Sequence, residues 1–512
     1  MRSKKVLINS IFGILGYGIL MLSNFITRKV FVDTLGLSMA GVDTVFKNFL
    51  QVLSLAELGL STGLIYKLYK PIEEHDNIAI KKVLNFYKQA YKVIAGVFLL
   101  GAFVLAFIVP SFTHDTDKSY LYLGFLFFLY AGDTVASYLF ANRKALIVAD
   151  QNNYIVNRND AGISLMSLLL QVLFLYLTKS FILYAVIKIF CRLTGAFLIG
   201  RKFNKMYPEV AAIKTKEMIS GEERKSLLHN MSAMLCHKIG SVSVTASGSA
   251  IISGMISTVQ AGIYGNYVLI TNTVIMLITQ VFGGITASFG NILTVEKKEV
   301  IYRKFNMLYF FNYAVISFCT VSVAVLIQPF MKFWIGSDPA NLFPQKTVIL
   351  LLCYFYVFGI RRVILMAKDS AGLYRPDRYF AVAEAVINIV MSIGFISISN
   401  SVDGLILANV LSMLIIPFWT QPIIVYKQIL KQNPAVYYAK YFIYAAITAG
   451  LTVLTCFLAN SVVKTDNLIL EIILRAIICL IVPNVINFAI FARTNEFKDI
   501  IVMFKGLLKR KN

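Results

Sequence analysis

The stretch GVDTVFKNFLQVLSLAELGLSTGLIYKLYKP, residues Gly41 to Pro71, decides the fold of this chain. It is long and apolar enough to cross a bilayer as one helix, for which about 20 residues suffice. Polar and charged residues nevertheless recur inside it, and on a helix with 100° per residue they fall within a stripe roughly 120° wide. The residues of this stripe are Lys47, Gln51, Ser54, Glu57 and Ser61.

A polar stripe on an otherwise apolar helix has two interpretations. A charged side chain at the bilayer centre costs about 2.5–3.5 kcal/mol, so such residues face a bundle interior or a water-filled cavity. Alternatively, Lys47 extends its ammonium group to the membrane surface and Glu57 forms a single structural ion pair. We favour the first interpretation, in which this helix forms the wall of a polar path across a membrane.

The composition is that of a polytopic membrane protein. Of the 512 residues, 58% are hydrophobic and 15% are charged, and the mean hydropathy is +0.72, whereas soluble domains carry about 25% charged residues. The net charge of +23 does not predict nucleic-acid binding, because Lys and Arg lie mainly in short segments between apolar runs. All six cysteines lie inside apolar runs without a CxxC motif, which predicts buried thiols, no disulfide and no metal site.

Fourteen apolar runs predict fourteen membrane-spanning helices. They lie near residues 8–27, 41–66, 89–110, 120–140, 161–179, 181–200, 230–253, 262–290, 306–328, 346–366, 380–399, 404–426, 439–460 and 469–491. The first run follows a basic segment, as in a signal peptide, but it has no small-residue cleavage site. We therefore expect it to remain as the first helix.

Basic residues are distributed unequally between the two sides of these predicted spans. Cytoplasmic loops of membrane proteins carry the excess of Lys and Arg, so both termini are predicted to be cytoplasmic. Among the 49 basic residues, the few in the predicted outer loops are Arg28, Lys29, Lys118, Lys179, Lys332 and Lys464.

The predicted spans form two blocks of six, followed by two more. The predicted regions are an N-terminal lobe over 1–205, a cytoplasmic loop over 206–229, a C-terminal lobe over 230–430, spans 13 and 14 over 431–492, and a basic cytoplasmic tail over 493–512. We expect an all-helical polytopic membrane fold, with the two lobes in a pseudo-twofold arrangement and a substrate path between them.

A faint internal repeat supports this division. Three residues of the N-terminal lobe recur in the C-terminal lobe at one constant offset, as duplicated parallel repeats would show. The pairs are Gly41 with Gly262, Phe46 with Tyr267, and Gly63 with Gly284.

Basic residues within or at the ends of spans are the candidates for substrate binding. Lys188 and Arg192 are one helical turn apart and share a face of their helix. A cationic cavity favours an anionic cargo, and the planar fork of Arg matches phosphate geometry. For basic residues near span ends, extension to the membrane surface is the alternative. The candidates are Arg28, Lys47, Lys188, Arg192 and Lys238.

Three acidic residues, Glu57, Asp133 and Glu384, lie inside predicted spans. Such carboxylates either carry H⁺ or Na⁺ or neutralise neighbouring cations, and we favour neutralisation. Gln51 and Asn272 are candidate polar residues of the cavity, able to hydrogen-bond sugar hydroxyls, although small polar residues also pack membrane helices closely. No cofactor is predicted beyond such an ion.

Motifs of common enzyme classes are missing from the sequence. There is no HExxH, no Walker A loop and no GxSxG. The motif Asp115-Thr-Asp117 has the DxD pattern of many glycosyltransferases, but it lies in a predicted outer loop, on the wrong side for cytoplasmic sugar donors. We therefore predict that the chain is not an enzyme.

Three segments resemble the bacterial polysaccharide repeat-unit flippases of the Wzx type. They are TRKVFVDTLGLSMAGVDTVFKNFLQVLSLAELGLSTGLIYKLYKP over Thr27–Pro71, AGLYRPDRYFAVAEAVINIVMSIGF over Ala371–Phe395, and WTQP over Trp419–Pro422. These flippases belong to the exporter superfamily that also holds the multidrug MATE transporters and the lipid II flippases. The resemblance covers nearly the whole chain and is silent on the cargo.

This resemblance implies a function in surface-polysaccharide assembly. It implies a multi-pass protein of the bacterial cytoplasmic membrane that moves undecaprenyl-diphosphate-linked oligosaccharides to the outer leaflet by alternating access. The partners would be this glycolipid, membrane lipids, and a polysaccharide polymerase with its chain-length machinery. The basic residues that match the family's cavity pattern are Arg28, Lys47, Arg192 and Lys238. The alternatives are an ion-coupled multidrug exporter, a lipid II-type flippase and, ranked last, a membrane polysaccharide polymerase.

Overall fold

The computed structural model describes residues 2–57, 60–113, 115–225, 242, 246–373 and 376–509. Within these residues the regular structure is helical throughout. The chain divides into two compact units, Met1–Gly262 and Ile263–Asn512, called unit 1 and unit 2 below. The predicted lobe boundaries at residues 205 and 230 remain predictions.

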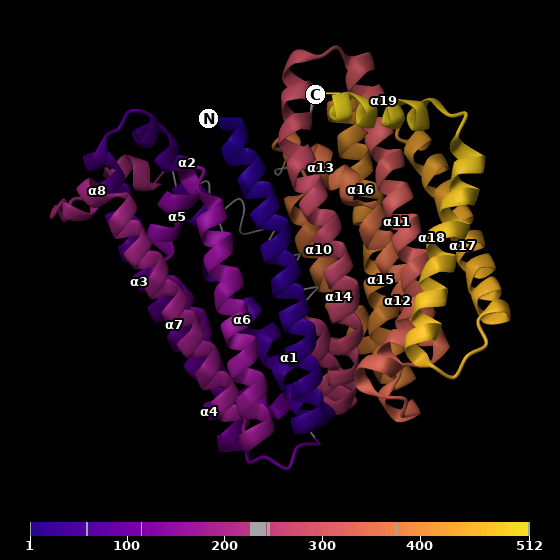
Figure 1. Ribbon diagram of the computed structural model, residues 1–512, viewed down its shortest axis with the longest axis horizontal. Coiled ribbons are helices and arrows are strands. Elements are labelled where there is room, and N and C mark those ends of the chain that lie inside the picture. The colour runs from indigo at the N-terminus through magenta and orange to yellow at the C-terminus, as the bar shows by residue number, and fades with distance from the viewer. Residues whose placement is uncertain are drawn as a thin grey trace. The chain divides into compact units, whose positions relative to one another are not determined.

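Unit 1 is a bundle of long helices with short helices at one end (Figure 1). Helix α6 packs along α1 and α7, and α4 packs against α3 and α7. Its elements are α1 (Arg2–Leu53), η1 (Ser54–Glu57), α2 (Leu60–Glu73), α3 (Asn77–Ala106), η2 (Val109–Phe112), α4 (Tyr120–Tyr138), α5 (Ala141–Ala149), α6 (Asn153–Thr178), α7 (Phe181–Met206), α8 (Pro208–Ala212) and the beginning of α10 (Thr258–Val295).

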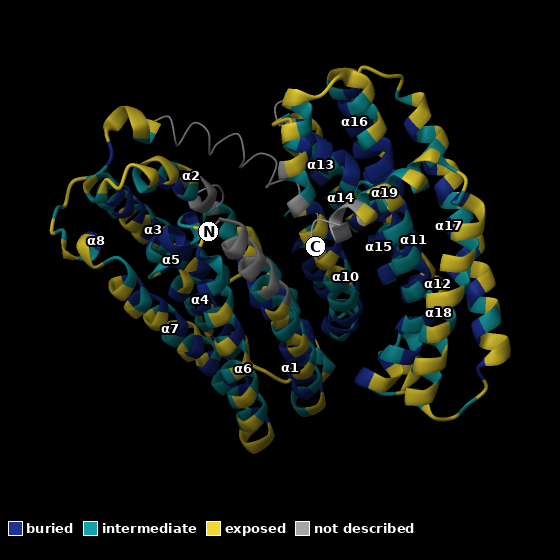
Figure 2. Cartoon of the chain, turned by 45° about the horizontal axis from the view of Figure 1, so that its top comes forward, coloured by how far each residue is buried: buried dark blue, intermediate teal, exposed yellow. Residues whose placement is uncertain are grey.

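Unit 2 is built around α11, which packs against α12, α17 and α18 and carries the C-terminal helix α19. Figure 2 shows that α17 and α18 expose much of their surface. Its elements after α10 are α11 (Lys298–Ile335), η3 (Pro339–Asn341), α12 (Gln345–Ile360), α13 (Arg362–Ser370), α14 (Arg378–Ser399), α15 (Val402–Ile415), α16 (Pro417–Ile424), η4 (Val425–Leu430), α17 (Ala435–Val462), α18 (Leu468–Phe491) and α19 (Asn495–Lys509).

The structure confirms an all-helical polytopic membrane fold. Among the described residues, eleven helices or helix pairs are long and apolar enough to cross a membrane, and each coincides with one of the fourteen predicted spans. Their outward faces carry large exposed apolar side chains, such as Phe457 on α17 and Leu480 on α18. Surfaces of this kind are typical of helices that face lipid. Most of the predicted span 230–253 lies outside the described residues.

The first two predicted spans differ most from the structure. The first lies in α1 and the second begins there, and between them α1 is interrupted by the non-helical Gly36 (φ 83°, ψ 171°). A positive φ of this size is accessible mainly to glycine. The predicted helix over 41–66 is also not continuous, because α1 ends at Leu53 and a 3₁₀ turn follows. The hydroxyl of Ser54 donates to the carbonyl of Gln51 at 2.7 Å, a local bond that competes with helical pairing.

This break divides the predicted polar stripe among three elements. Lys47 and Gln51 lie on α1, Ser54 and Glu57 lie in η1, and Ser61 begins α2. A single helical face therefore does not carry all five residues. The predicted cysteine environment also needs one correction. The five described cysteines are free thiols, and of these Cys191 and Cys479 are buried, Cys319 and Cys456 are half-buried and Cys353 is exposed.

The backbone itself repeats once along the chain. Helices α5 and α13 each contain nine residues, and their first residues are separated by the same offset as Gly41 and Gly262. Left-handed backbone positions recur at that offset as well. The pairs are Asp115 (φ 58°) with Gly336 (φ 116°), Gln151 (φ 59°) with Gly372 (φ 64°), and Lys179 (φ 48°) with Asn400 (φ 47°). The internal repeat predicted from three residues is therefore also present in the turns.

Candidate functional site

A buried carboxylate, Asp43, lies at the centre of a polar cluster in unit 1. Its Oδ2 atom lies 2.9 Å from Nη1 of Arg28 and 2.7 Å from Nζ of Lys47. The Tyr130 hydroxyl donates to its other oxygen at 2.8 Å. Asp43 therefore pairs with two cations at once, and its other oxygen accepts a hydrogen bond from a phenol.

The pairing of Arg28 with Asp43 depends on Gly36. On a straight helix, residues 28 and 43 would be about 22 Å apart, because each residue adds 1.5 Å. The chain reverses between them at the positive φ of Gly36. The reversal at this glycine thus brings Arg28, at the end of the first predicted span, against Asp43 in the second predicted span.

Arg28 is held mainly by protein acceptors. In addition to Asp43, its guanidinium donates to the carbonyl of Ala40 at 3.1 Å and to the hydroxyl of Thr44 at 3.1 Å. It also donates to the carbonyl of Gly262 at 3.3 Å. Most donors of its fork are therefore already occupied, and the side chain is 9% exposed. Arg28 is thus fixed within unit 1 by these contacts, and its predicted role in substrate binding remains a prediction.

A second carboxylate, Asp133 on α4, pairs with two cations of α7, Lys188 and Arg192. Nζ of Lys188 lies 3.1 Å from Oδ2, and Nε of Arg192 lies 3.0 Å from Oδ1. Nη2 of Arg192 also donates to Oδ2 at 3.5 Å. The shared helical face predicted from the spacing of Lys188 and Arg192 is confirmed by their common partner.

Tyr130 connects the two ion-paired groups. It lies about one helical turn before Asp133 on α4, and it donates to Asp43 while Nζ of Lys188 lies 5.3 Å from the centre of its ring. A cation over an aromatic face is attracted by the ring quadrupole. This set of side chains is called the cationic cluster. Its members are Arg28, Asp43, Lys47, Tyr130, Asp133, Lys188 and Arg192.

The cations of this cluster are more exposed than the acids that hold them. The side chains of Lys47 and Arg192 are 48% and 49% exposed, whereas those of Asp43 and Asp133 are 3% and 11% exposed. Buried aromatic rings, including Phe46 and Phe181, pack against Tyr130. The acids and rings thus hold the charged groups of Lys47 and Arg192 at the surface of unit 1. Charge interactions are strengthened there, because the aromatic rings beneath lower the local dielectric constant.

The other predicted site residues lie apart from this cluster. Gln51 is exposed near the end of α1, and Glu57 is half-buried in η1. In unit 2, Asn272 is exposed on α10, and Glu384 on α14 lies 3.6 Å from Nη1 of Arg361. Lys238 lies outside the described residues.

Sequence reasoning missed Asp43 and Tyr130. Asp43 stands four residues before Lys47 within the stretch Gly41 to Pro71, a spacing that places both side chains on one helical face. That spacing was the available signal for their ion pair. Tyr130 offered none, because a Tyr within an apolar run is indistinguishable from an ordinary core residue.

The second repeat does not reproduce these charges. At the same offset, unit 2 carries Tyr264 in place of Asp43 and Asn409 in place of Lys188. The positions that match Lys47, Asp133 and Arg192 are likewise neutral, being Val268, Tyr354 and Met413. The repeated backbone alone does not require the charges, so the cluster is specific to unit 1.

No family model and no curated protein matches the sequence. Solved structures do match the fold. A MATE family multidrug resistance transporter of the MOP superfamily, in an inward-facing conformation, gives a TM-score of 0.64 at 12% identity, covering 78% of this chain and 94% of that chain. The lipid II flippase MurJ, in an inward closed conformation, gives 0.65 at 14% identity, covering 94% of this chain and 99% of that chain.

A third match is a MOP superfamily transporter from Pyrococcus furiosus, described as having a binding pocket of reverse polarity. It gives a TM-score of 0.56 at 14% identity, covering 84% of this chain and 97% of that chain. At these identities the likeness shows the fold. The chain is thus a multi-pass membrane protein with the all-helical fold of these transporters.

Proposed function

We propose that this protein moves undecaprenyl-diphosphate-linked oligosaccharide repeat units from the inner to the outer leaflet of a bacterial cytoplasmic membrane. Both termini lie in the cytoplasm, and a polysaccharide polymerase with its chain-length machinery receives the product. The observation that carries the proposal is the charge of the cationic cluster. Four cations share two carboxylates, which leaves an excess of two positive charges in unit 1, whose long helices are membrane spans.

The geometry of the cluster suits a diphosphate. Lys47 and Arg192 are half-exposed, and each is oriented by a buried acid. A diphosphate diester carries about two negative charges, which match the excess. Charge-assisted hydrogen bonds from Lys and Arg to phosphate oxygens are about twice as strong as neutral ones. Because the cations are already held in place, the ligand does not bear the cost of ordering them.

Transport needs a polar path because of the sugars. Transfer of a hydroxyl into hydrocarbon without a hydrogen-bond partner costs about 4–8 kcal/mol on the water-to-cyclohexane scale, so an oligosaccharide cannot cross lipid unaided. In alternating access, the protein supplies these partners to the sugars and the diphosphate while the prenyl chain stays in lipid. Gln51 and Asn272, both exposed, are proposed contacts for sugar hydroxyls.

The membrane potential can drive this movement. Moving one elementary charge across 100 mV is worth about 2.3 kcal/mol, so a dianionic headgroup gains about twice that when it moves out of an inside-negative cell. No cofactor is needed in this scheme. Coupling to H⁺ or Na⁺ through Glu57 or Glu384 would add to the driving force, while Asp133 balances the charge of Lys188 and Arg192.

Substitutions at the exposed cations test the proposal. In a strain that depends on this protein for surface polysaccharide, Lys47→Gln and Arg192→Gln should each abolish export while the protein remains in the membrane at its normal level. Lys47→Arg and Arg192→Lys, which keep the charge, should retain part of it. Arg201→Gln is the matched control, because Arg201 lies on α7 with Arg192 but stacks on Phe197 at 4.4 Å outside the cluster. Normal export by both Gln variants would refute the proposal.

A lipid II-type flippase is the second candidate function. Its support is the match to MurJ, which covers nearly all of both chains. Complementation distinguishes the two candidates, because a lipid II-type flippase should restore growth to cells depleted of their own lipid II flippase. A repeat-unit flippase should restore surface polysaccharide instead.

An ion-coupled multidrug exporter is the remaining transport function on this fold, as the match to a MATE transporter illustrates. A cationic drug would be repelled by the excess positive charge of the cluster. Deletion of the gene should therefore leave susceptibility to cationic drugs unchanged. A consistent increase in susceptibility, reversed by the wild-type gene, would favour the exporter.

A further inference from the structure

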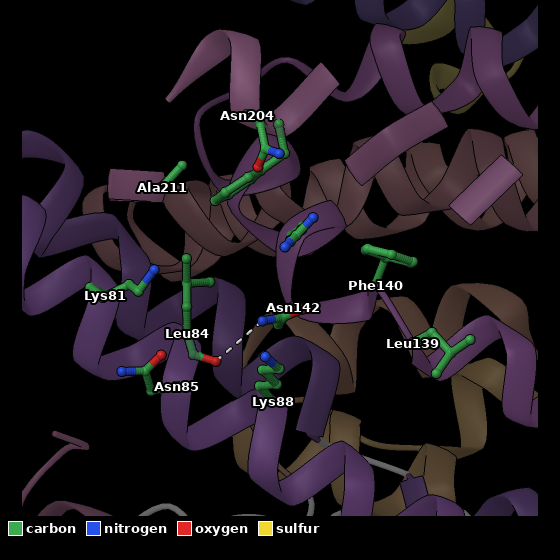
Figure 3. A pocket seen from close by; sticks show the side chains of 11 residues that line it. Lys81, Leu84, Asn85, Lys88, Leu139, Phe140, Asn142, Asn204 and Ala211 are labelled. Atoms are coloured by element: carbon green, nitrogen blue, oxygen red, sulfur yellow. Dashed lines mark hydrogen bonds between the residues drawn. The ribbon is translucent and has the colours of Figure 1, made fainter. Parts of the chain in front are cut away.

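A second basic site lies in unit 1 and shares no residue with the cationic cluster. It is a pocket of about 450 Å³ where α3, α5, α7 and α8 meet (Figure 3). Lys81, Asn85 and Lys88 line it from α3, Asn142 and Arg143 from α5, and Asn204 from α7. The lining contains three cations and three amides, and none of its residues is acidic.

The cations of this pocket lack acidic partners among the residues that the structure describes. Nζ of Lys81 donates only to the carbonyl of Val210 at 3.1 Å. The guanidinium of Arg143 lies between two rings, 5.0 Å from the centre of Phe140 and 5.5 Å from that of Phe203. Neither Arg143 nor Lys88 forms an ion pair with a described residue. Like charges gathered without a counterion repel one another, and an anion in the pocket would relieve that repulsion.

Two of the amides are already committed to the backbone. Nδ2 of Asn142 donates to the carbonyl of Leu84 at 3.3 Å, as Figure 3 shows. Nδ2 of Asn85 donates to the carbonyls of Thr215 at 2.8 Å and Glu217 at 3.1 Å. These bonds fix the walls of the pocket, so its shape is set before any ligand binds. Among the described residues, the donors that remain are those of Lys88 and Arg143, the amide of Asn204, and the N–H groups of Lys81 that do not bind Val210.

The pocket lies at the level where lipid headgroups are expected. Lys81 and Lys88 precede the apolar run that begins near residue 89, and Asn204 follows the run that ends near residue 200. Leu139, an apolar lining residue, is 56% exposed. A basic hollow with an exposed apolar residue at its edge matches a lipid, which has an anionic headgroup and an apolar tail, better than it matches a free ion.

We propose that this pocket binds the phosphodiester of an anionic membrane phospholipid, with Lys88 and Arg143 on the phosphate and the acyl chains beside Leu139. Basic pockets between membrane helices on the cytoplasmic side are known to hold such headgroups. The internal repeat supports a dedicated role. At the same offset, unit 2 carries Tyr302, Tyr309 and Ile364 in place of Lys81, Lys88 and Arg143, so the shared backbone does not require the cations.

The test uses the full chain, purified and delipidated in detergent. Native mass spectrometry measures binding of phosphatidylglycerol against phosphatidylcholine of the same chain length, and thermal unfolding measures the stabilisation by each lipid. Lys88→Gln is the main variant, because Lys88 is exposed and its loss should not disturb folding. Lys92→Gln is the matched control, one turn further along α3, exposed and outside the pocket.

The wild-type protein should bind phosphatidylglycerol in preference to phosphatidylcholine. Lys88→Gln should weaken that binding roughly five-fold, as expected for one cation near an anionic headgroup, and Lys92→Gln should leave it unchanged. Equal losses in the two variants, or equal binding of the two lipids, would overturn the proposal. A further arm adds inorganic phosphate at millimolar concentration. Stabilisation by phosphate alone that is lost in Lys88→Gln would identify a site for the free ion and would equally overturn the lipid assignment.

Discussion

Nζ of Lys47 lies 2.7 Å from Oδ2 of Asp43, one helical turn earlier on α1. The same oxygen accepts a hydrogen bond from Nη1 of Arg28 at 2.9 Å. Asp43 is therefore shared between a cation that is 9% exposed and one that is 48% exposed. The two pairs should contribute very differently to stability and to transport.

We expect Asp43→Asn to destabilise unit 1 strongly. It leaves the buried guanidinium of Arg28 without its counterion, and breaking a buried pair in this way costs about 3–5 kcal/mol. Lys47→Gln should cost less than about 1 kcal/mol, as for an exposed pair, while export is lost. Thermal unfolding of the purified variants in one detergent measures the difference. Equal melting temperatures for the two variants would contradict this account of Asp43.

Asp133 should show coupling to both of its partners. Asp133→Asn leaves Lys188 and Arg192 without a carboxylate, so their mutual repulsion is no longer balanced. Removing one of the cations as well, in Asp133→Asn/Lys188→Gln, should recover part of the lost stability. For residues in one network we expect a coupling energy of about 0.5–3 kcal/mol, measured by a double-mutant cycle on thermal unfolding. Additive effects would show that the three side chains do not act together.

A close backbone approach makes Gly41 sensitive to substitution. A Cβ atom on Gly41 would lie 1.9 Å from the carbonyl oxygen of Thr258, far inside van der Waals contact, so the helices would have to separate. Gly41→Ala should therefore lower the yield of folded protein or its melting temperature by several degrees. Gly96→Ala on α3 is the control, because a Cβ there meets no atom within 4 Å and alanine is the better helix former by about 0.5–1 kcal/mol. A Gly41→Ala protein as stable as Gly96→Ala would rule out the close approach.

The sequence predicted the class of fold well, because apolar runs of about 20 residues are a strong signal for membrane-spanning helices. It predicted the internal repeat from three residues, and the left-handed turns at Lys179 and Asn400 show the same offset in the backbone. It placed a loop between the spans 8–27 and 41–66, but it did not predict that helix continues through most of that loop with a single break at Gly36, because a glycine carries no sign of its φ angle. Ion pairs between distant residues, such as Arg28 with Asp43, were equally hidden, because they depend on that break.

Within the site, sequence reasoning found the four cations and Asp133, but not Asp43 or Tyr130. Lys188 and Arg192 were identified because they lie well inside an apolar run. A charged side chain is costly at that depth in a membrane, so its presence there indicates a function. Asp133 was identified for the same reason. The contribution of Tyr130 depends on which face of α4 meets α1, and that orientation arises from packing rather than from local pattern.

The C-terminal helix α19 should be held less firmly to unit 2 at low pH. Two hydrogen bonds from Arg303 to Asp499, one of 2.7 Å and one of 2.5 Å, lower the pKa of the Asp499 carboxyl below its usual value of 3.8. A carboxyl with a lowered folded-state pKa stabilises the folded form above its unfolded pKa. That stabilisation is lost as the pH falls through the folded value, so attachment should be complete at neutral pH and should weaken below about pH 4.

A spin-label distance between α19 and α11 measures this attachment as a function of pH. Asp499→Asn should weaken the attachment at neutral pH as acid does in the wild type, because it removes the charge without changing the shape of the side chain. Lys498→Gln is the control, since Lys498 neighbours Asp499 and is exposed. A distance in Asp499→Asn that matches the wild type at every pH would show that apolar contacts alone hold α19.

Unit 2 contains its own buried ion pair, between Lys368 on α13 and Asp377 before α14, with side chains that are 4% and 2% exposed. Nε2 of Gln421 on α16 also donates to Asp377 at 3.5 Å, so three elements meet at one carboxylate. Asp377→Asn leaves the buried ammonium group of Lys368 without the carboxylate it pairs with, which should cost about 3–5 kcal/mol. Adding Lys368→Met removes that ammonium group as well, so the double variant should be more stable than Asp377→Asn alone. Thermal unfolding distinguishes these cases, and a double variant less stable than Asp377→Asn alone would mean that the pair positions α13 and α14 through its geometry rather than merely balancing charge.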